Sequence, residues 1–185
     1  MTADLCDAFA EVLSYPADRN PGPAPALERL AGIRRIGHGE EQAEKQVLAF
    51  VSRFAEEIQD LTTGDLQELY TRTFDINPIT SLEIGWHLYG EAYERGAFLV
   101  RMRGLLRRHG ITESMELPDH LTHGLRLLGR MDKAEADSFA QQCLLPALHK
   151  MLDGFAGQSS PYSNILQAIV TCLEQLRVQG DTAHG

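Results

Sequence analysis

The residues best suited to chemistry lie together between positions 116 and 123, in the run ELPDHLTH. His120 and His123 are three residues apart, so on a helix their rings would face the same side, with Glu116 or Asp119 nearby. Imidazole nitrogens combined with a carboxylate are a ligand set that zinc and related metals accept. One interpretation is therefore a small metal-dependent enzyme that uses these two histidines and a carboxylate.

The same run also has a purely structural interpretation. Carboxylates at the start of a helix accept hydrogen bonds from free amides and interact favourably with the helix dipole, as Glu116 and Asp119 would. Pro118 suits the first turn of such a helix, and His120 would bond to an acid or a backbone carbonyl. The residue types favour this structural interpretation over the metal site.

Other common catalytic patterns do not occur in the sequence. It contains no glycine-rich phosphate loop, no G-x-S-x-G elbow, no C-x-x-C pair and no H-E-x-x-H helix. Cys6, Cys143 and Cys172 are far apart and lie in apolar, helix-like patterns, which indicates reduced core thiols. We therefore predict that the protein is not an enzyme and that it carries no bound metal or cofactor.

Composition and charge narrow the class of protein further. The chain has 185 residues, of which 43% are hydrophobic and 23% charged, as in an ordinary globular domain. Its short apolar runs predict no membrane insertion, and its formal net charge of −9 disfavours nucleic acid and favours basic peptides. No Lys or Arg precedes Arg19, unlike a secretory signal, which predicts a cytoplasmic protein.

Apolar residues recur every three or four positions through nearly the whole chain, the period of an α-helix. The clearest stripe is Val47, Val51, Phe54, Ile58 and Leu61, which predicts one long helix from about residue 40 to 61. Further stripes predict helices near 2–14, 27–33, 65–74, 80–108, 118–128, 132–155 and 161–178. The expected fold is an all-α, single-domain helical bundle over 1–178, with a frayed tail at 179–185.

Local signals refine these helices. Thr80 and Glu83 form a T-x-x-E capping box, which predicts a helix start there. Gly90 and Gly96 are candidates for a bend, and Pro146 is expected to kink or split its helix. Four aromatic residues with helical spacing are expected to lie mostly in the core, and four arginines to form a solvated face: Trp86, Tyr89, Tyr93 and Phe98; Arg101, Arg103, Arg107 and Arg108.

Several short blocks are similar to those of a known family. They are LSYP at 13–16, YTRTF at 70–74, TSL at 80–82, HLYGE at 87–91, ERG at 94–96 and ELPDHL at 116–121. Through these blocks the chain resembles the nitrate reductase molybdenum cofactor assembly chaperones, the NarJ-type branch of the TorD-like redox-enzyme maturation chaperones. Thr73 departs from the pattern, because the family usually has leucine there.

The resemblance implies a TorD-like bundle that acts as a chaperone for a molybdenum oxidoreductase. Such a chaperone binds the N-terminal peptide of the catalytic subunit, most simply that of a respiratory nitrate reductase, and holds it for molybdenum cofactor insertion. The candidate peptide-binding residues are Tyr70, Phe74, Tyr89, Glu91, Glu116, Asp119 and His120. The motif residues with an expected structural role are Tyr15, Pro16, Ser81, Gly90, Arg95, Gly96, Pro118 and Leu121.

Roles for these residues follow from their chemistry. We expect the three aromatic candidates to line an interhelical groove and Glu91 and Asp119 to engage basic peptide residues. His120 would make recognition depend on pH near neutrality. A permanent structural subunit of an oxidoreductase remains an alternative, and both a monomer and a dimer fit the sequence.

Overall fold

The structure is a computed structural model that describes residues 1–17, 23–32, 41–157 and 160–181, with side chains up to residue 175. Its α-helices are α1 Ala3–Val12, α2 Ala24–Ala31, α3 Glu41–Ile58, α4 Thr63–Tyr70, α5 Ile84–Tyr89, α6 Tyr93–Arg108, α7 Leu121–Leu128, α8 Lys133–Phe139, α9 Leu145–Asp153 and α10 Pro161–Asp181. Two π-helical turns occur at Thr71–Asp75 and Ala140–Leu144. Because the described residues form helices and no strand, the predicted all-α class is confirmed.

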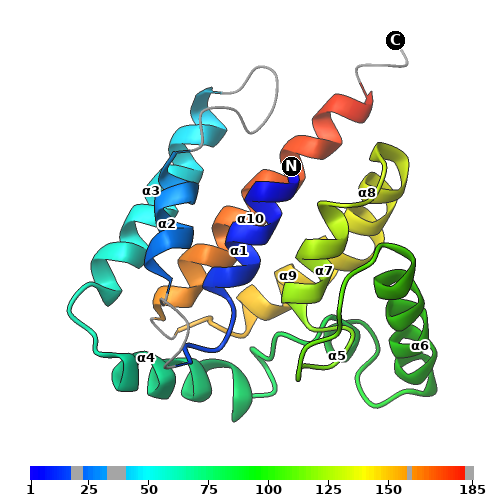
Figure 1. Cartoon of the computed structure of the whole chain (residues 1–185), viewed down its shortest axis with the longest axis horizontal. Coiled ribbons are helices and arrows are strands. Elements are labelled where there is room, and N and C mark those ends of the chain that lie inside the picture. Colours follow the sequence, from blue (N-terminus) through cyan, green and yellow to red (C-terminus); the bar gives the residue numbers. More distant parts are fainter. Residues whose placement is uncertain (18–22, 33–40, 158–159, 182–185) are drawn as a thin grey trace.

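The long helix α10 runs through the body of the molecule (Figure 1). It packs against α3 on one side and against α9 on the other. Helix α1 lies against α7 and α2, whereas α6 lies at an edge of the molecule and contacts α5 and α7. The family blocks lie after α1, at the end of α4 and in the π turn that follows it, before and on α5, at the start of α6 and before α7.

The predicted stripe of α3 is buried against α10. Val47, Val51, Phe54 and Ile58 are all buried, as is Ile165 on α10. Burying one such side chain contributes roughly 1.5–3 kcal/mol, so this helix pair alone accounts for a large part of the core. Residue 33, the end of the helix predicted near 27–33, lies outside the described residues.

Side chains cap the starts of two helices. Thr2 accepts a hydrogen bond from the Leu5 amide at the start of α1, and Asp132 accepts one from the Glu135 amide before α8. An unpredicted reciprocal capping box joins Thr62 to Asp65 at the start of α4. The T-x-x-D pattern at residues 62–65 is a sequence signal for such a box.

The predicted capping box at residues 80–83 is wrong. Thr80 is buried and its hydroxyl donates to the Thr73 carbonyl, while Glu83 pairs with Arg95 at 2.8 Å. Helix α5 begins only at Ile84. Both side chains are therefore engaged by distant segments, and these tertiary contacts replace the local cap.

The predicted helix over 80–108 is two helices, because Gly90 interrupts it. Gly90 has φ 59°, a left-handed conformation that glycine adopts without steric cost. Gly96, the other candidate for a bend, lies inside α6. The next helix also differs from its prediction, since α7 begins at Leu121 and Pro118 precedes it rather than occupying its first turn.

Pro146 splits its helix as predicted. The helical stretch consists of α8, the π turn Ala140–Leu144 and α9. In the turn, the Leu145 amide donates to the Ala140 carbonyl five residues earlier. Proline at position 146 has no amide hydrogen for the usual bond to residue 142, which favours this local widening.

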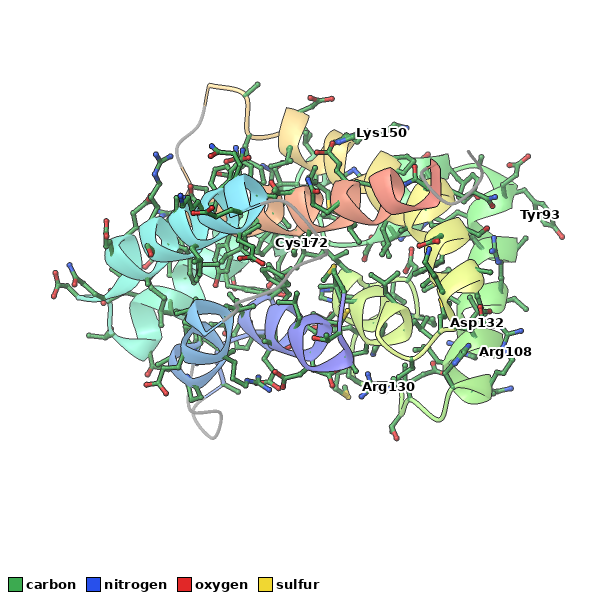
Figure 2. All side chains as sticks on the ribbon, turned by 90° about the horizontal axis from the view of Figure 1, so that it is seen from above. Tyr93, Arg108, Arg130, Asp132, Lys150 and Cys172 are labelled. Carbon is green, nitrogen blue, oxygen red and sulfur yellow. The ribbon has the colours of Figure 1, made fainter. Side chains whose placement is uncertain are left out.

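The three cysteines are free and buried, which confirms their prediction as core thiols. Burial raises the pKa of Cys6 and of Cys172 to about 12, so both stay protonated at neutral pH. Cys172 lies within the body of the molecule (Figure 2).

None of the helices in the described part of the chain is both long and apolar enough to cross a bilayer.

The domain boundaries stay a prediction. Helix α10 extends to Asp181, and residues 182–185 of the predicted tail lie outside the described residues.

Candidate functional site

Two family blocks that are far apart in the sequence pair through their backbones. The Leu121 amide donates to the Leu82 carbonyl at 2.8 Å, and the Ile84 amide donates to the Asp119 carbonyl at 2.9 Å. These bonds form an isolated antiparallel bridge between Glu83 and His120. The start of α5 and the start of α7 are thereby held together as one unit.

Asp119 caps α5 rather than its own helix. Its Oδ2 accepts from the Gly85 amide at 2.8 Å, and its carbonyl already accepts from Ile84, so one residue satisfies two free amides of α5. The side chain is completely buried, and this burial raises the pKa of the Asp119 carboxyl. Its Oδ1 has no hydrogen-bond partner among the described residues.

His120 is the N-cap of α7. Its Nδ1 lies 2.8 Å from the Thr122 hydroxyl, and the ring is buried. Burial lowers the pKa of His120 to about 3, with smaller contributions from His123 and Arg126. The ring is therefore uncharged at neutral pH, and the expectation that its titration tunes recognition there is not supported.

His123 uses both ring nitrogens for local structure. Its Nδ1 lies 3.0 Å from the Leu117 carbonyl, which accepts the proton, and its Nε2 accepts from the Ser114 amide at 3.2 Å. The centroids of the His120 and His123 rings are 6.5 Å apart. In the described part of the chain, no group of three or more His, Cys, Asp or Glu side chains is placed to hold a metal. The arrangement of His123 gives the metal-dependent interpretation no support.

A pocket of about 350 Å³ lies where the family blocks meet. Its lining residues come from the π turn after α4, the loop before α5, the starts of α5 and α6, and the ELPDH run: Phe74, Asp75, Pro78, Ser81, Leu82, Glu83, Trp86, Arg95, Glu116 and His120. We call it the acidic pocket. The Trp86 indole donates to the Pro78 carbonyl at 2.8 Å, and the Arg95 guanidinium lies 5.3 Å from the centre of the Trp86 ring.

Negative charge dominates the acidic pocket. Arg95 pairs with Glu83, whereas Asp75 and Glu116 have no ion-pair partner among the described residues. Partial burial raises the pKa of Glu116, and the charges of Asp75 and Glu83 raise it further. A cation placed among these carboxylates would relieve their repulsion, so the pocket favours a positively charged group.

Exposed apolar side chains stand beside these carboxylates. Ile76 and Ile79 lie in the turn that also supplies Asp75 and Pro78, and they are 72% and 62% exposed. Met115 and Leu117 flank Glu116 and are also exposed. Large apolar side chains gathered on a surface mark contact sites for other molecules. Each of these four side chains is adjacent in sequence to a lining residue of the acidic pocket.

An aromatic cluster supports the pocket from inside. The Tyr70 ring lies 5.1 Å from Phe74, 5.4 Å from Tyr15 and 5.9 Å from Tyr162, measured between ring centroids. Tyr70 is 2% exposed, and its hydroxyl donates to the Leu13 carbonyl at 3.3 Å. The LSYP and YTRTF blocks are thus joined by aromatic packing.

The structure brings only some of the predicted binding residues together. Phe74, Glu116 and His120 line the acidic pocket with the motif residues Ser81 and Arg95. The other four lie elsewhere: Tyr70 and Asp119 are buried beneath it, Tyr89 packs against Phe98, and Glu91 is exposed in the turn after Gly90.

Five lining residues were not among the candidates, namely Asp75, Pro78, Leu82, Glu83 and Trp86. Each lies in or within a few residues of a family block, and this proximity was the signal that could have found it.

The expectation that the aromatic residues of 86–98 are mostly core is wrong. Of the four, Phe98 is buried, whereas Tyr89 is partly exposed and Tyr93 is 89% exposed.

A second concavity of about 650 Å³ lies between α2, α3 and α4. We call it the apolar groove, because most of its lining residues are apolar: among them are Pro16, Leu27, Val51, Ala55 and Leu66. Pro16 connects it to the LSYP block. Of the candidate peptide-binding residues and motif residues named from the sequence, only Pro16 lines the apolar groove.

The fold and the acidic pocket define a class: a helical domain with concave sites suited to binding. Residues 40–161 match the family model described as nitrate reductase delta subunit, and the chain belongs to this family. This result confirms the resemblance inferred from the short blocks.

Two curated relatives extend the comparison. The chain is 37% identical over 83 residues to the nitrate reductase molybdenum cofactor assembly chaperone NarJ of Escherichia coli K12 and, equally, to that of Escherichia coli O157:H7. The matched stretch covers 43% of this chain and 35% of each relative. The similarity therefore spans about a third of the length of these relatives.

Proposed function

We propose that this protein is a non-enzymatic assembly chaperone for a molybdenum oxidoreductase, as the relatives are named to be for nitrate reductase. It binds the N-terminal peptide of the catalytic subunit in the cytoplasm and holds that subunit for molybdenum cofactor insertion. Release then allows the subunit to join its complex. The named relatives support the chaperone class, and the acidic pocket supports peptide binding.

The observation that carries the proposal is the juxtaposition of charge and apolar surface at the acidic pocket. A basic peptide side chain fits between Asp75 and Glu116, where two carboxylates lack a partner among the described residues. In this proposal, apolar peptide side chains contact Ile76, Ile79 and Leu117, which are exposed and adjacent in sequence to lining residues. An amphipathic peptide with both features matches this surface.

Tyr70 and Asp119 do not line the acidic pocket and act through residues that do. Tyr70 supports Phe74, and Asp119 holds the start of α5, which carries Trp86. In this proposal Phe74, Glu116, Asp75 and Trp86 touch the peptide.

The test is calorimetric titration with a peptide that copies the N-terminus of the molybdoenzyme catalytic subunit encoded beside this gene. We expect sequence-dependent binding with a dissociation constant of about 1 µM or tighter, roughly −8 kcal/mol. A scrambled peptide of equal charge should bind at least about tenfold more weakly, because apolar contacts need the correct order. Equal binding of both peptides would contradict a specific chaperone site.

Substitutions in the acidic pocket test whether the peptide binds there. Asp75→Asn with Glu116→Gln should weaken binding about tenfold or more. The matched control, Glu56→Gln with Asp60→Asn, changes the net charge equally at exposed positions on and just after α3, outside the pocket lining, and should bind as the parent does. If the large side chain of Ala55→Trp in the apolar groove abolishes binding while the pocket variant does not, the pocket is the wrong site.

The family description favours a second candidate function, a lasting subunit of an oxidoreductase. The two differ in what happens after maturation. A chaperone separates from the mature, cofactor-loaded enzyme on size-exclusion chromatography, whereas a subunit elutes with it at fixed stoichiometry.

A further inference from the structure

Helix α6 is basic in a protein that is acidic as a whole. The chain has 26 Asp and Glu residues against 17 Lys and Arg, yet α6 carries one glutamate and five arginines. Two of these arginines, Arg101 and Arg107, are exposed and have no hydrogen-bond or ion-pair partner among the described residues. Positive charge is therefore concentrated on one element.

The outward face of α6 also carries an apolar seam. Tyr93, Ala97, Val100 and Gly104 follow one another at spacings of four and three residues, the spacing of a helix-packing stripe. Tyr93 and Val100 are 89% and 71% exposed, and Ala97 is exposed too. Figure 2 shows Tyr93 pointing away from the body at the outer edge of the molecule.

The opposite face of α6 holds the helix on the bundle. Phe98, Met102 and Leu106 are buried there, so the seam is a second apolar stripe on the same helix. Nothing lies within 4 Å of the position that a Cβ would take on Gly96 or Gly104. A partner helix can therefore approach the α6 backbone closely at these two positions.

Charged side chains frame the seam. Arg103 pairs with Glu113 at 3.0 Å and Arg108 pairs with Glu135, so these two arginines are held in place beside it. Arg101 and Arg107 remain available to carboxylates of a partner. Arginine binds carboxylates through two parallel hydrogen bonds, which gives such pairs both strength and orientation.

We propose that the outward face of α6, the α6 face, is a docking surface for an acidic amphipathic helix of a partner protein. The apolar seam packs against the apolar stripe of that helix, and Arg101 and Arg107 pair with its flanking carboxylates. This surface differs from the acidic pocket, which suits a basic peptide. One chain can thus hold two partner segments of opposite charge.

Fluorescence anisotropy with a labelled three-heptad peptide tests the proposal. The probe carries Leu at its a and d positions and Glu at its e and g positions, and its control carries Lys at e and g. The glutamate peptide should bind, with affinity falling as salt rises, and the lysine peptide should bind at least about tenfold more weakly. Equal affinity for both peptides would overturn the proposal.

Protein variants connect binding to the α6 face. Val100→Asp and Arg101→Glu should each weaken binding of the glutamate peptide about tenfold or more, with unchanged circular dichroism. Arg53→Glu on α3 makes the same change in net charge as Arg101→Glu and should bind as the parent does. Gly104→Phe should block close approach and Gly104→Ala should not, because only the larger side chain fills the open space.

Two outcomes would assign the α6 face to another occupant and overturn the proposal. One is a dimer on analytical ultracentrifugation that Val100→Asp dissociates, which would assign the face to a second copy of this chain. The other is binding to phosphatidylglycerol vesicles that Arg101→Glu abolishes, with no binding of the glutamate peptide. In that case the partner would be an anionic lipid surface.

Discussion

The Asp119 carboxyl and the Gly85 amide are joined by a buried hydrogen bond of 2.8 Å that holds the start of α7 against the start of α5. The approach is so close that a Cβ on Gly85 would lie 2.6 Å from Asp119 Oδ2 and 2.9 Å from the Phe98 ring. No real Cβ tolerates such distances without movement of its neighbours. Position 85 therefore requires glycine for Asp119 to reach its amide, although 34 positions separate the two residues.

Gly85→Ala should lower the free energy of unfolding by about 1–3 kcal/mol, because the added methyl group overpacks a buried contact. Chemical denaturation monitored by circular dichroism measures the change. Gly104→Ala is the matched control: it lies in a helix with open space around it, and should raise stability by about 0.5–1 kcal/mol. Equal effects at the two positions would show that the close contact has no energetic consequence.

Asp119→Ala should destabilise the protein by about 1–3 kcal/mol, because the Gly85 amide loses its buried acceptor. Asp119→Asn should cost less, since an amide oxygen can still accept that bond. Peptide affinity measured on the folded Asp119→Asn protein should stay near that of the parent. A large loss of affinity without loss of stability would instead place Asp119 in contact with the peptide.

His120→Asn should make stability less dependent on pH in the acid range. The pKa of His120 falls from its ordinary 6.5 to about 3 on folding, so below pH 6.5 the unfolded chain binds a proton that the folded protein excludes. The contribution of the neutral ring is present above pH 6.5 and is lost as pH falls toward 3. Asparagine keeps the N-cap acceptor and removes the titration.

Denaturation curves between pH 7 and pH 4 measure this difference. His87 and His123 also have lowered pKa values and are unchanged in the variant. Asp119 and Glu116 have raised pKa values, which act in the opposite direction as pH falls. Only the difference between parent and variant therefore reports on His120, and parallel curves would mean that its ring titrates normally.

Tyr70→Phe should lower the free energy of unfolding by about 0.5–1.5 kcal/mol, because its hydroxyl is the partner of the buried Leu13 carbonyl. Tyr70→Ala should cost about 3–5 kcal/mol, since the cavity also removes packing against Phe74 and Tyr162. Thermal melts followed by circular dichroism test both. Tyr15→Phe changes a partly exposed ring and should have little effect; a loss equal to that of Tyr70→Phe would contradict the assigned bond.

Local patterns in the sequence predicted most of the helices. The stripe of α3 and the split at Pro146 depend on neighbours within a few residues, so the sequence displays them directly. The short blocks likewise led to the family. The capping box at Thr80 failed for the opposite reason, because its partners Thr73 and Arg95 come from other segments.

The sequence by itself determined an acidic, all-helical protein of a recognisable family, since composition, periodicity and short motifs are properties of the chain. Only the tertiary structure decided which motif residues face solvent. Asp119 was expected to meet a ligand and is buried as the cap of α5, whereas Trp86 and Asp75 line the acidic pocket. Helical spacing places residues on a common face, but the packing of other helices determines whether that face is covered.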